Sequence, residues 1–113
     1  MASTVFAVPI LPGKTEAWKS AVAEMTGPRR NEYVESRRAL GITKEVVCLQ
    51  QTPHGDYVCV YLEAGNVSGI LQDMIGATDP FGRWFSEAIL KDIHGMDPSQ
   101  PPPPANEVFA DLI

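Results

Sequence analysis

Three segments of the chain are rich in apolar and β-branched residues and are bounded by turn-forming residues, which is the pattern of β-strands. They run from Thr4 to Ile10, from Thr43 to Gln51 and from Tyr57 to Ala64. The first is followed by the dipeptide PG, and the other two are joined by TPHGD, whose proline and glycine favour a turn. The second and third segments are therefore predicted to form a β-hairpin.

The alternation within the hairpin predicts which residues face one another. With TPHGD as the turn, Leu49 lies opposite Val60 and Val47 lies opposite Leu62, so that one face is wholly aliphatic. The other face then carries a valine beside thiol, amide and phenol groups, namely Val46, Cys48, Gln50, Tyr57, Cys59 and Tyr61.

Apolar residues recur at helical spacing in the segments between and after the strands. A first helix is predicted from Lys14 to Gly41, with a kink or restart at Pro28 because proline lacks the amide hydrogen that a helix uses. A second helix is predicted from Asn66 to Gly76. A third begins with Asp79 as its N-cap, followed by a proline at the first helical position, and ends near Gly95.

The order of these elements predicts the fold class. After Pro101 to Pro104, a last short segment from Val108 to Leu112 completes the order strand, helix, strand, strand, helical segment, strand. This order matches a ferredoxin-like split βαβ fold of the α+β class, a four-stranded antiparallel sheet with helices on one face and the first and third strands at its centre. Residues 1–97 are predicted to form the ferredoxin-like domain, and residues 98–113 a proline-rich C-terminal arm of the same domain.

A sheet with helices on one face leaves its other face in need of cover. Tyr57, Cys59, Tyr61 and Cys48, with residues of the first strand, would form an apolar patch larger than a monomer usually exposes. A second copy of the chain covers such a patch with a single surface used twice. The expected partner is therefore the chain itself, in a homodimer.

In this organisation the chain resembles the dimeric α/β barrel superfamily, which includes the antibiotic biosynthesis monooxygenases. The segments DPFGRWF and IHGMDPSQPPPP resemble an uncharacterised bacterial branch of it. The resemblance implies a ligand cavity between sheet and helices and, as in some members, oxidation of aromatic substrates without metal or flavin. No cofactor is therefore expected, and no active-site residue of the monooxygenases maps onto a position of this chain.

Charge and hydropathy exclude two classes of partner. The net charge of −5 disfavours nucleic acid, and no apolar run reaches the roughly 20 residues that a membrane span needs. The N-terminus has no positive charge before its short apolar segment, so we expect a cytoplasmic protein without a signal peptide.

One cluster of basic residues contains Arg29, Arg30, Arg37 and Arg38, together with Glu32 and Glu35. It is interpreted as a solvated helix with internal ion pairs or, alternatively, as an anion site.

The sequence contains no motif typical of metal, nucleotide or serine-hydrolase sites, so no metal site is predicted.

The individual cysteine and histidine side chains are expected to be structural. Cys48 and Cys59 are expected to lie diagonally across the hairpin as buried free thiols, and His54 is expected to be solvated in the turn. On an α-helical wheel of the third helix, Arg83 and His94 fall on the wet face.

Asp92 falls instead on the apolar stripe of that wheel, in a last helical turn whose dipole disfavours a carboxylate. Such a conflict between local preferences is expected at a functional or strained position. The alternatives are that the helix frays before Asp92 or that Asp92 accepts a structural hydrogen bond.

Three functions are therefore considered. The first is a dimer that binds a small aromatic or acyl molecule between sheet and helices, in a cavity lined by Trp18, Tyr61, Trp84 and Phe85. The second is a cofactor-independent monooxygenase or isomerase with Asp92 as its catalytic base. The third is a structural or interaction protein whose polyproline arm clasps a partner.

Overall fold

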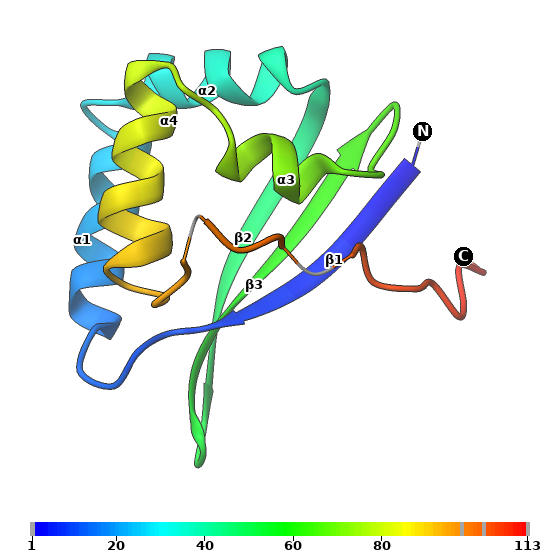
Figure 1. Ribbon diagram of the computed structural model, residues 1–113. Helices are drawn as coiled ribbons and strands as arrows, with labels where there is room; N and C mark the ends of the chain where they lie inside the picture. Colours follow the sequence, from blue (N-terminus) through cyan, green and yellow to red (C-terminus); the bar gives the residue numbers. More distant parts are fainter. Residues whose placement is uncertain (1, 98, 103, 113) are drawn as a thin grey trace.

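The computed structural model describes residues 2–97, 99–102 and 104–112 of the chain, as an α+β fold with three strands, four α-helices and one π-helical turn, the helices being packed on one side of the sheet (Figure 1). In chain order the elements are β1 (Ala2–Pro9), α1 (Thr15–Thr26), α2 (Arg30–Ala39), β2 (Ile42–Thr52), β3 (Gly55–Ala64), α3 (Ile70–Ile75), α4 (Pro80–Trp84) and the π-helical turn η1 (Phe85–Lys91), which continues α4 without a break. None of the described helices is long and apolar enough for a bilayer span.

The sheet is antiparallel and has three strands in the order β1-β3-β2, so the predicted four-stranded ferredoxin-like sheet is wrong. Residues 104–112 contain no strand, and β1 is an edge strand where the prediction placed it in the centre. The arm reaches β1 through a side chain, because Asn106 Nδ2 donates to Val5 O at 2.7 Å. Beyond that bond Phe109 and Leu112 are 90% exposed, so the segment lacks the burial that would hold it on the sheet.

The predicted hairpin is confirmed, but its register differs by two residues. Leu49 lies opposite Val58 and Val47 opposite Val60, because the loop is shorter than predicted and Thr52 already pairs with Gly55. A shift of two residues leaves every side chain on its predicted face. The aliphatic face is therefore the one that packs against the helices, as expected.

The cysteines are affected by this register. Cys48 lies directly opposite Cys59 on the open face of the sheet, where the prediction had them diagonal. Both are free thiols; Cys48 is exposed and Cys59 half-buried, so the expectation of two buried thiols is wrong. His54 is exposed in the turn, as predicted.

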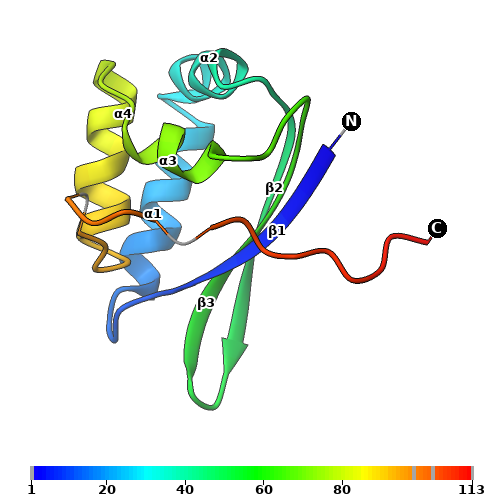
Figure 2. The same ribbon diagram turned by 45° about the vertical axis from the view of Figure 1, so that its right-hand side comes forward.

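The predicted first helix is broken into α1 and α2 around Pro28, in agreement with the expected restart there. Figure 2 shows α1, the helix formed by α4 and η1, and the short α3 together on one side of the sheet, with α2 across one end. The core lies between these helices and the inward face of β3, whose alternate residues Val58, Val60, Leu62 and Ala64 are all buried.

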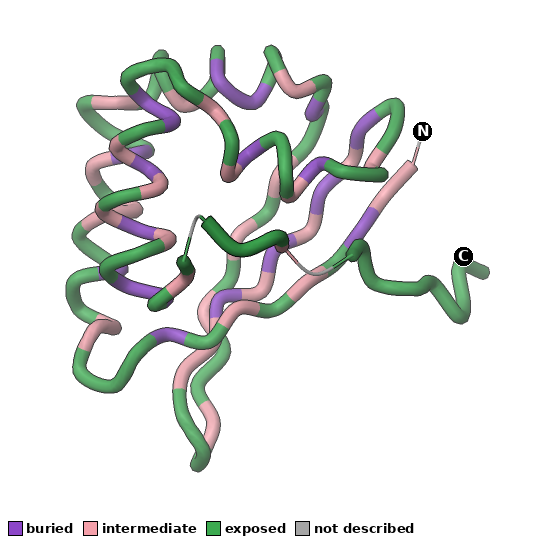
Figure 3. Tube along the Cα trace, in the orientation of Figure 1, coloured by how far each residue is buried: buried purple, intermediate pink, exposed green. Residues whose placement is uncertain are grey.

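The opposite face of the sheet has no covering element among the described residues. Val5 is 56% exposed and Val46 40% exposed there, beside half-buried Tyr57 and Tyr61. Burial along the trace shows mostly exposed and half-buried positions in β1 and β2, whereas most of β3 alternates between buried and half-buried positions (Figure 3). The predicted open face is therefore present in this single chain.

Candidate functional site: a cavity between the sheet and the helices

A cavity of about 570 Å³ lies between the inward face of the sheet and the helices. The C-terminal arm contributes to its walls, because it runs from the end of η1 across to β1 (Figures 1 and 2). Most of the lining is apolar and comes from every layer of the fold, including Phe6, Val8, Trp18, Val22, Met25, Val47, Val58, Val60, Leu71, Met74, Phe85, Ile89, Met96, Pro102 and Pro104. A resemblance to a known family led us to expect a cavity in this position.

Three polar side chains meet where α2 crosses β2. The Tyr33 hydroxyl donates to Glu45 Oε1, and Arg37 Nε donates to Glu45 Oε2 at 3.1 Å. The Arg37 and Glu45 side chains are only 9% and 8% exposed, so this is a buried ion pair whose carboxylate is shared with a tyrosine. All three residues line the cavity.

Aromatic rings surround this ion pair. The guanidinium carbon of Arg37 lies 4.7 Å from the ring centre of Phe85 and 5.1 Å from that of Tyr33. These distances are within the range of cation–π attraction, which favours the charged guanidinium. Burial, followed by the charge of Glu45, raises the pKa of Tyr33 well above its ordinary value, so its hydroxyl stays a hydrogen-bond donor.

The other end of the cavity is shaped by the helix that α4 and η1 form together. This helix begins with Asp79, the N-cap of α4, which accepts a hydrogen bond from Gly82 N at 3.3 Å, as predicted. From Phe85 onward the helix widens: Asp92 N bonds to Glu87 O at 3.2 Å and His94 N to Ile89 O at 3.1 Å, each five residues back. In an α-helix each backbone N–H donates to the carbonyl oxygen four residues earlier. A π-helical turn, which is closed by a bond to the fifth residue back, therefore contains one extra residue.

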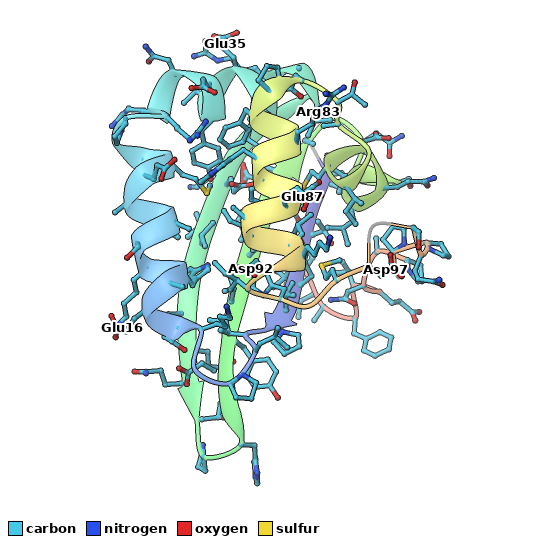
Figure 4. The ribbon with its side chains drawn as sticks, turned by 60° about the vertical axis from the view of Figure 1, so that its left-hand side comes forward. Glu16, Glu35, Arg83, Glu87, Asp92 and Asp97 are labelled. Atoms are coloured by element: carbon cyan, nitrogen blue, oxygen red, sulfur yellow. The ribbon has the colours of Figure 1, made fainter. Side chains whose placement is uncertain are left out.

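This widening reverses the predicted orientation of two side chains. Because a π-helical turn contains more residues, each residue rotates less about the helix axis than an α-helical wheel assumes. The side chains after Phe85 therefore point in other directions than the wheel predicts, with His94 inward and Asp92 outward. His94 is buried, 9% exposed, and lines the cavity, whereas the Asp92 side chain is 68% exposed and lies 3.8 Å from Lys14 Nζ. The predicted positions of His94 on the wet face and of Asp92 on the apolar stripe are therefore wrong, whereas Arg83 is exposed as predicted (Figure 4).

The His94 ring is held in one orientation by the end of β1. Its Nδ1 lies 2.8 Å from Pro9 O, and a carbonyl oxygen can only accept, so Nδ1 carries the hydrogen. In the neutral ring Nε2 is then a hydrogen-bond acceptor. Burial lowers the pKa of His94, and the bond to Pro9 opposes this only in part, so the neutral form predominates at neutral pH.

The structure divides the predicted ligand-binding residues into two pairs. Trp18 and Phe85 line the cavity. Trp84 and Tyr61 lie outside its lining: the Trp84 ring packs 4.4 Å from the Arg29 guanidinium carbon, and Tyr61, on the open face, donates to Glu63 at 2.7 Å. Asp92 is also outside the lining, and its role as a base stays an untested prediction.

Sequence reasoning missed the polar residues of the cavity. The arginine cluster was interpreted as a solvated helix, which holds for Arg38 but not for buried Arg37. The helical spacing of Tyr33 and Arg37, four residues apart, is a signal that both share one face of α2. No local signal marks His94, because its burial depends on the wide turn of η1.

Comparison with protein-family models, with curated proteins and with solved structures finds no match to this chain.

Proposed function

We propose that this protein binds a small, largely apolar molecule in the cavity between sheet and helices. The volume of about 570 Å³ supports this, because ligand sites commonly measure about 300–1,000 Å³ and combine apolar walls with a few polar groups. Here the walls are aliphatic and aromatic, and the polar groups come from Tyr33, Arg37, Glu45 and His94.

The two tryptophans provide a test with its own control. Trp18 lines the cavity and Trp84 does not. In a Trp84→Phe variant, titration with an apolar ligand is expected to change the emission of Trp18. In a Trp18→Phe variant, the same titration is expected to leave the emission of Trp84 nearly unchanged. A panel of aromatic and long-chain ligands that alters neither variant, or alters only Trp84, would contradict the proposal.

We further propose that a second copy of the chain covers the open face of the sheet, as expected from the sequence. Support comes from the exposed Val5 and Val46 beside the half-buried tyrosines of β3. An interface related by two-fold symmetry would use this one surface twice and leave the cavity on the far side of each sheet. The cytoplasmic location stays a prediction from the sequence.

A further inference from the structure

The cavity has polar groups at two separate places with an apolar wall between them. Glu45 on β2 lies opposite Leu62 of β3, and Pro9 on β1 lies opposite Tyr57 of β3. These two positions of β3 are five residues apart, which is about 16 Å along a strand. Arg37 is bonded to Glu45 and His94 to Pro9, so the two polar groups mark two ends of an elongated site.

The end beside α2 offers hydrogen-bond donors without net charge. Nε of Arg37 donates to Glu45, and the guanidinium also donates to the Tyr33 hydroxyl. Because a guanidinium has five N–H groups, the hydrogens beyond these two contacts can donate to a ligand in the cavity that Arg37 lines. Because the charges of Arg37 and Glu45 cancel, a ligand carboxylate would add an uncompensated negative charge to a buried site, whereas a carbonyl oxygen would not.

The end beside β1 offers an acceptor. Since Nδ1 of His94 donates to Pro9 O, the remaining ring nitrogen Nε2 accepts. No described residue forms a hydrogen bond with Nε2. Every buried polar side-chain atom of the described residues has a partner, so Nε2 is not such an atom and is accessible. A hydroxyl group is a compact uncharged ligand group that can donate to such a nitrogen.

We propose that the cavity takes an uncharged, elongated apolar molecule with a carbonyl oxygen bound by Arg37 at one end and a hydroxyl group bound by His94 at the other. This assignment rests on the proposed function, since it names the class of ligand for the same cavity. Hydroxylated long-chain ketones and extended aromatic hydroxyketones belong to this class.

Three probes with the same long chain test this assignment: methyl undecyl ketone, its ω-hydroxy derivative, and laurate below the concentration at which it aggregates. Binding is followed by Trp18 emission in the Trp84→Phe variant. The ω-hydroxy ketone is expected to bind about three- to tenfold more tightly than the ketone, which corresponds to one net hydrogen bond, and laurate to bind more weakly than either. A derivative hydroxylated in mid-chain is the matched control and is expected to bind more weakly than the parent ketone, because its hydroxyl would lie against the apolar wall.

The outcomes separate this inference from the proposed function. If the ketone binds but laurate binds as tightly, or if the terminal hydroxyl weakens binding, the assignment of the ligand class is wrong and the apolar cavity stands. If none of the probes changes Trp18 emission, both are overturned. Because the comparison is made between ligands on one folded protein, it does not depend on the stability of a His94 or Arg37 variant.

Discussion

His94 and Pro9, 85 residues apart in the chain, are joined by a hydrogen bond of 2.8 Å between Nδ1 of the imidazole and the carbonyl oxygen of the proline. The bond connects the end of the helical layer to the end of β1 at one end of the cavity. It sets the tautomer of the buried ring and leaves its second nitrogen as an acceptor.

Acidification is expected to destabilise the protein through His94. Burial lowers the pKa of His94 in the folded state, so between its folded and unfolded pKa values the unfolded chain binds more protons. The free energy of unfolding should therefore fall as pH drops below the ordinary histidine pKa of about 6.5. Urea unfolding at several pH values between 5 and 8 measures this slope. His94→Asn should reduce it, and His54→Asn, in the exposed turn, should not; equal slopes in both variants would contradict the prediction.

Removing the charge of Glu45 is expected to cost about 3–5 kcal/mol of unfolding free energy, because it leaves the buried Arg37 without its counter-charge. The variant is Glu45→Gln, and chemical denaturation is the measurement. Glu35→Gln is the control, because the Glu35–Arg38 pair is more than 70% exposed on both sides and its loss should cost less than about 1 kcal/mol. A similar small loss in both variants would show that the buried pair does not stabilise the fold.

Alkaline pH is expected to weaken the fold through Tyr33. Its pKa is raised in the folded state, so above the ordinary tyrosine pKa the unfolded chain loses a proton that the folded chain keeps. The free energy of unfolding should therefore decrease as pH rises beyond about 10. Tyr33→Phe should show a shallower decrease over the same range in denaturant titrations. Parallel curves for the two proteins would argue against a raised pKa.

Gly82, at the start of α4, is expected to tolerate no side chain. A Cβ placed there would lie 2.6 Å from Ala77 Cβ and 2.8 Å from Asp79 Oδ1, so the N-cap must shift. Gly82→Ala should therefore cost about 1–3 kcal/mol in thermal or chemical unfolding. Gly65→Ala is the control, since a methyl group there would have no atom within 4 Å beyond its chain neighbours, and its effect should stay within about 1 kcal/mol.

Lysine on the open face of the sheet is expected to prevent association of two copies. Val46 is 40% exposed at the face that we propose forms the dimer, and a buried ammonium group facing its symmetry mate would be unfavourable. Light scattering coupled to size exclusion should give a dimer for the natural chain and a monomer for Val46→Lys. The exposed Val34→Lys on α2 is the matched control and should remain a dimer. A monomeric natural chain would refute the proposed interface.

Some features could be predicted from the sequence because they depend on neighbours in the chain. The hairpin follows from two apolar segments around a proline and glycine turn, the start of α4 from Asp79 and Pro80, and the break between α1 and α2 from Pro28. The faces of the strands followed from their alternation even though the register was displaced by two residues, because a displacement by two preserves the face. Trp18 and Phe85, which line the cavity, could be proposed as ligand-binding residues because both lie on apolar helical stripes, and this spacing is also a local property of the chain.

The remaining features depend on contacts between distant parts of the chain. The prediction of a last strand is wrong because a segment becomes a strand only when its backbone forms hydrogen bonds with the edge of a sheet. Here the arm contacts β1 through the Asn106 side chain. Arg37 is buried because Glu45 on β2 lies beneath it, a pairing that the spacing of charges on α2 does not reveal.

The sequence by itself determined β1, β2 and β3, the inward faces of the hairpin strands and the main helical segments, since hydrophobic periodicity and turn residues act over a few positions. Only the tertiary structure decided that His94 faces the cavity and Asp92 faces solvent. The wide turn of η1 makes that difference, and its five-residue hydrogen bonds form in the same packing that joins His94 to Pro9. A helical wheel assumes one constant rotation per residue, so it assigns these two side chains to the wrong sides wherever the helix departs from that rotation.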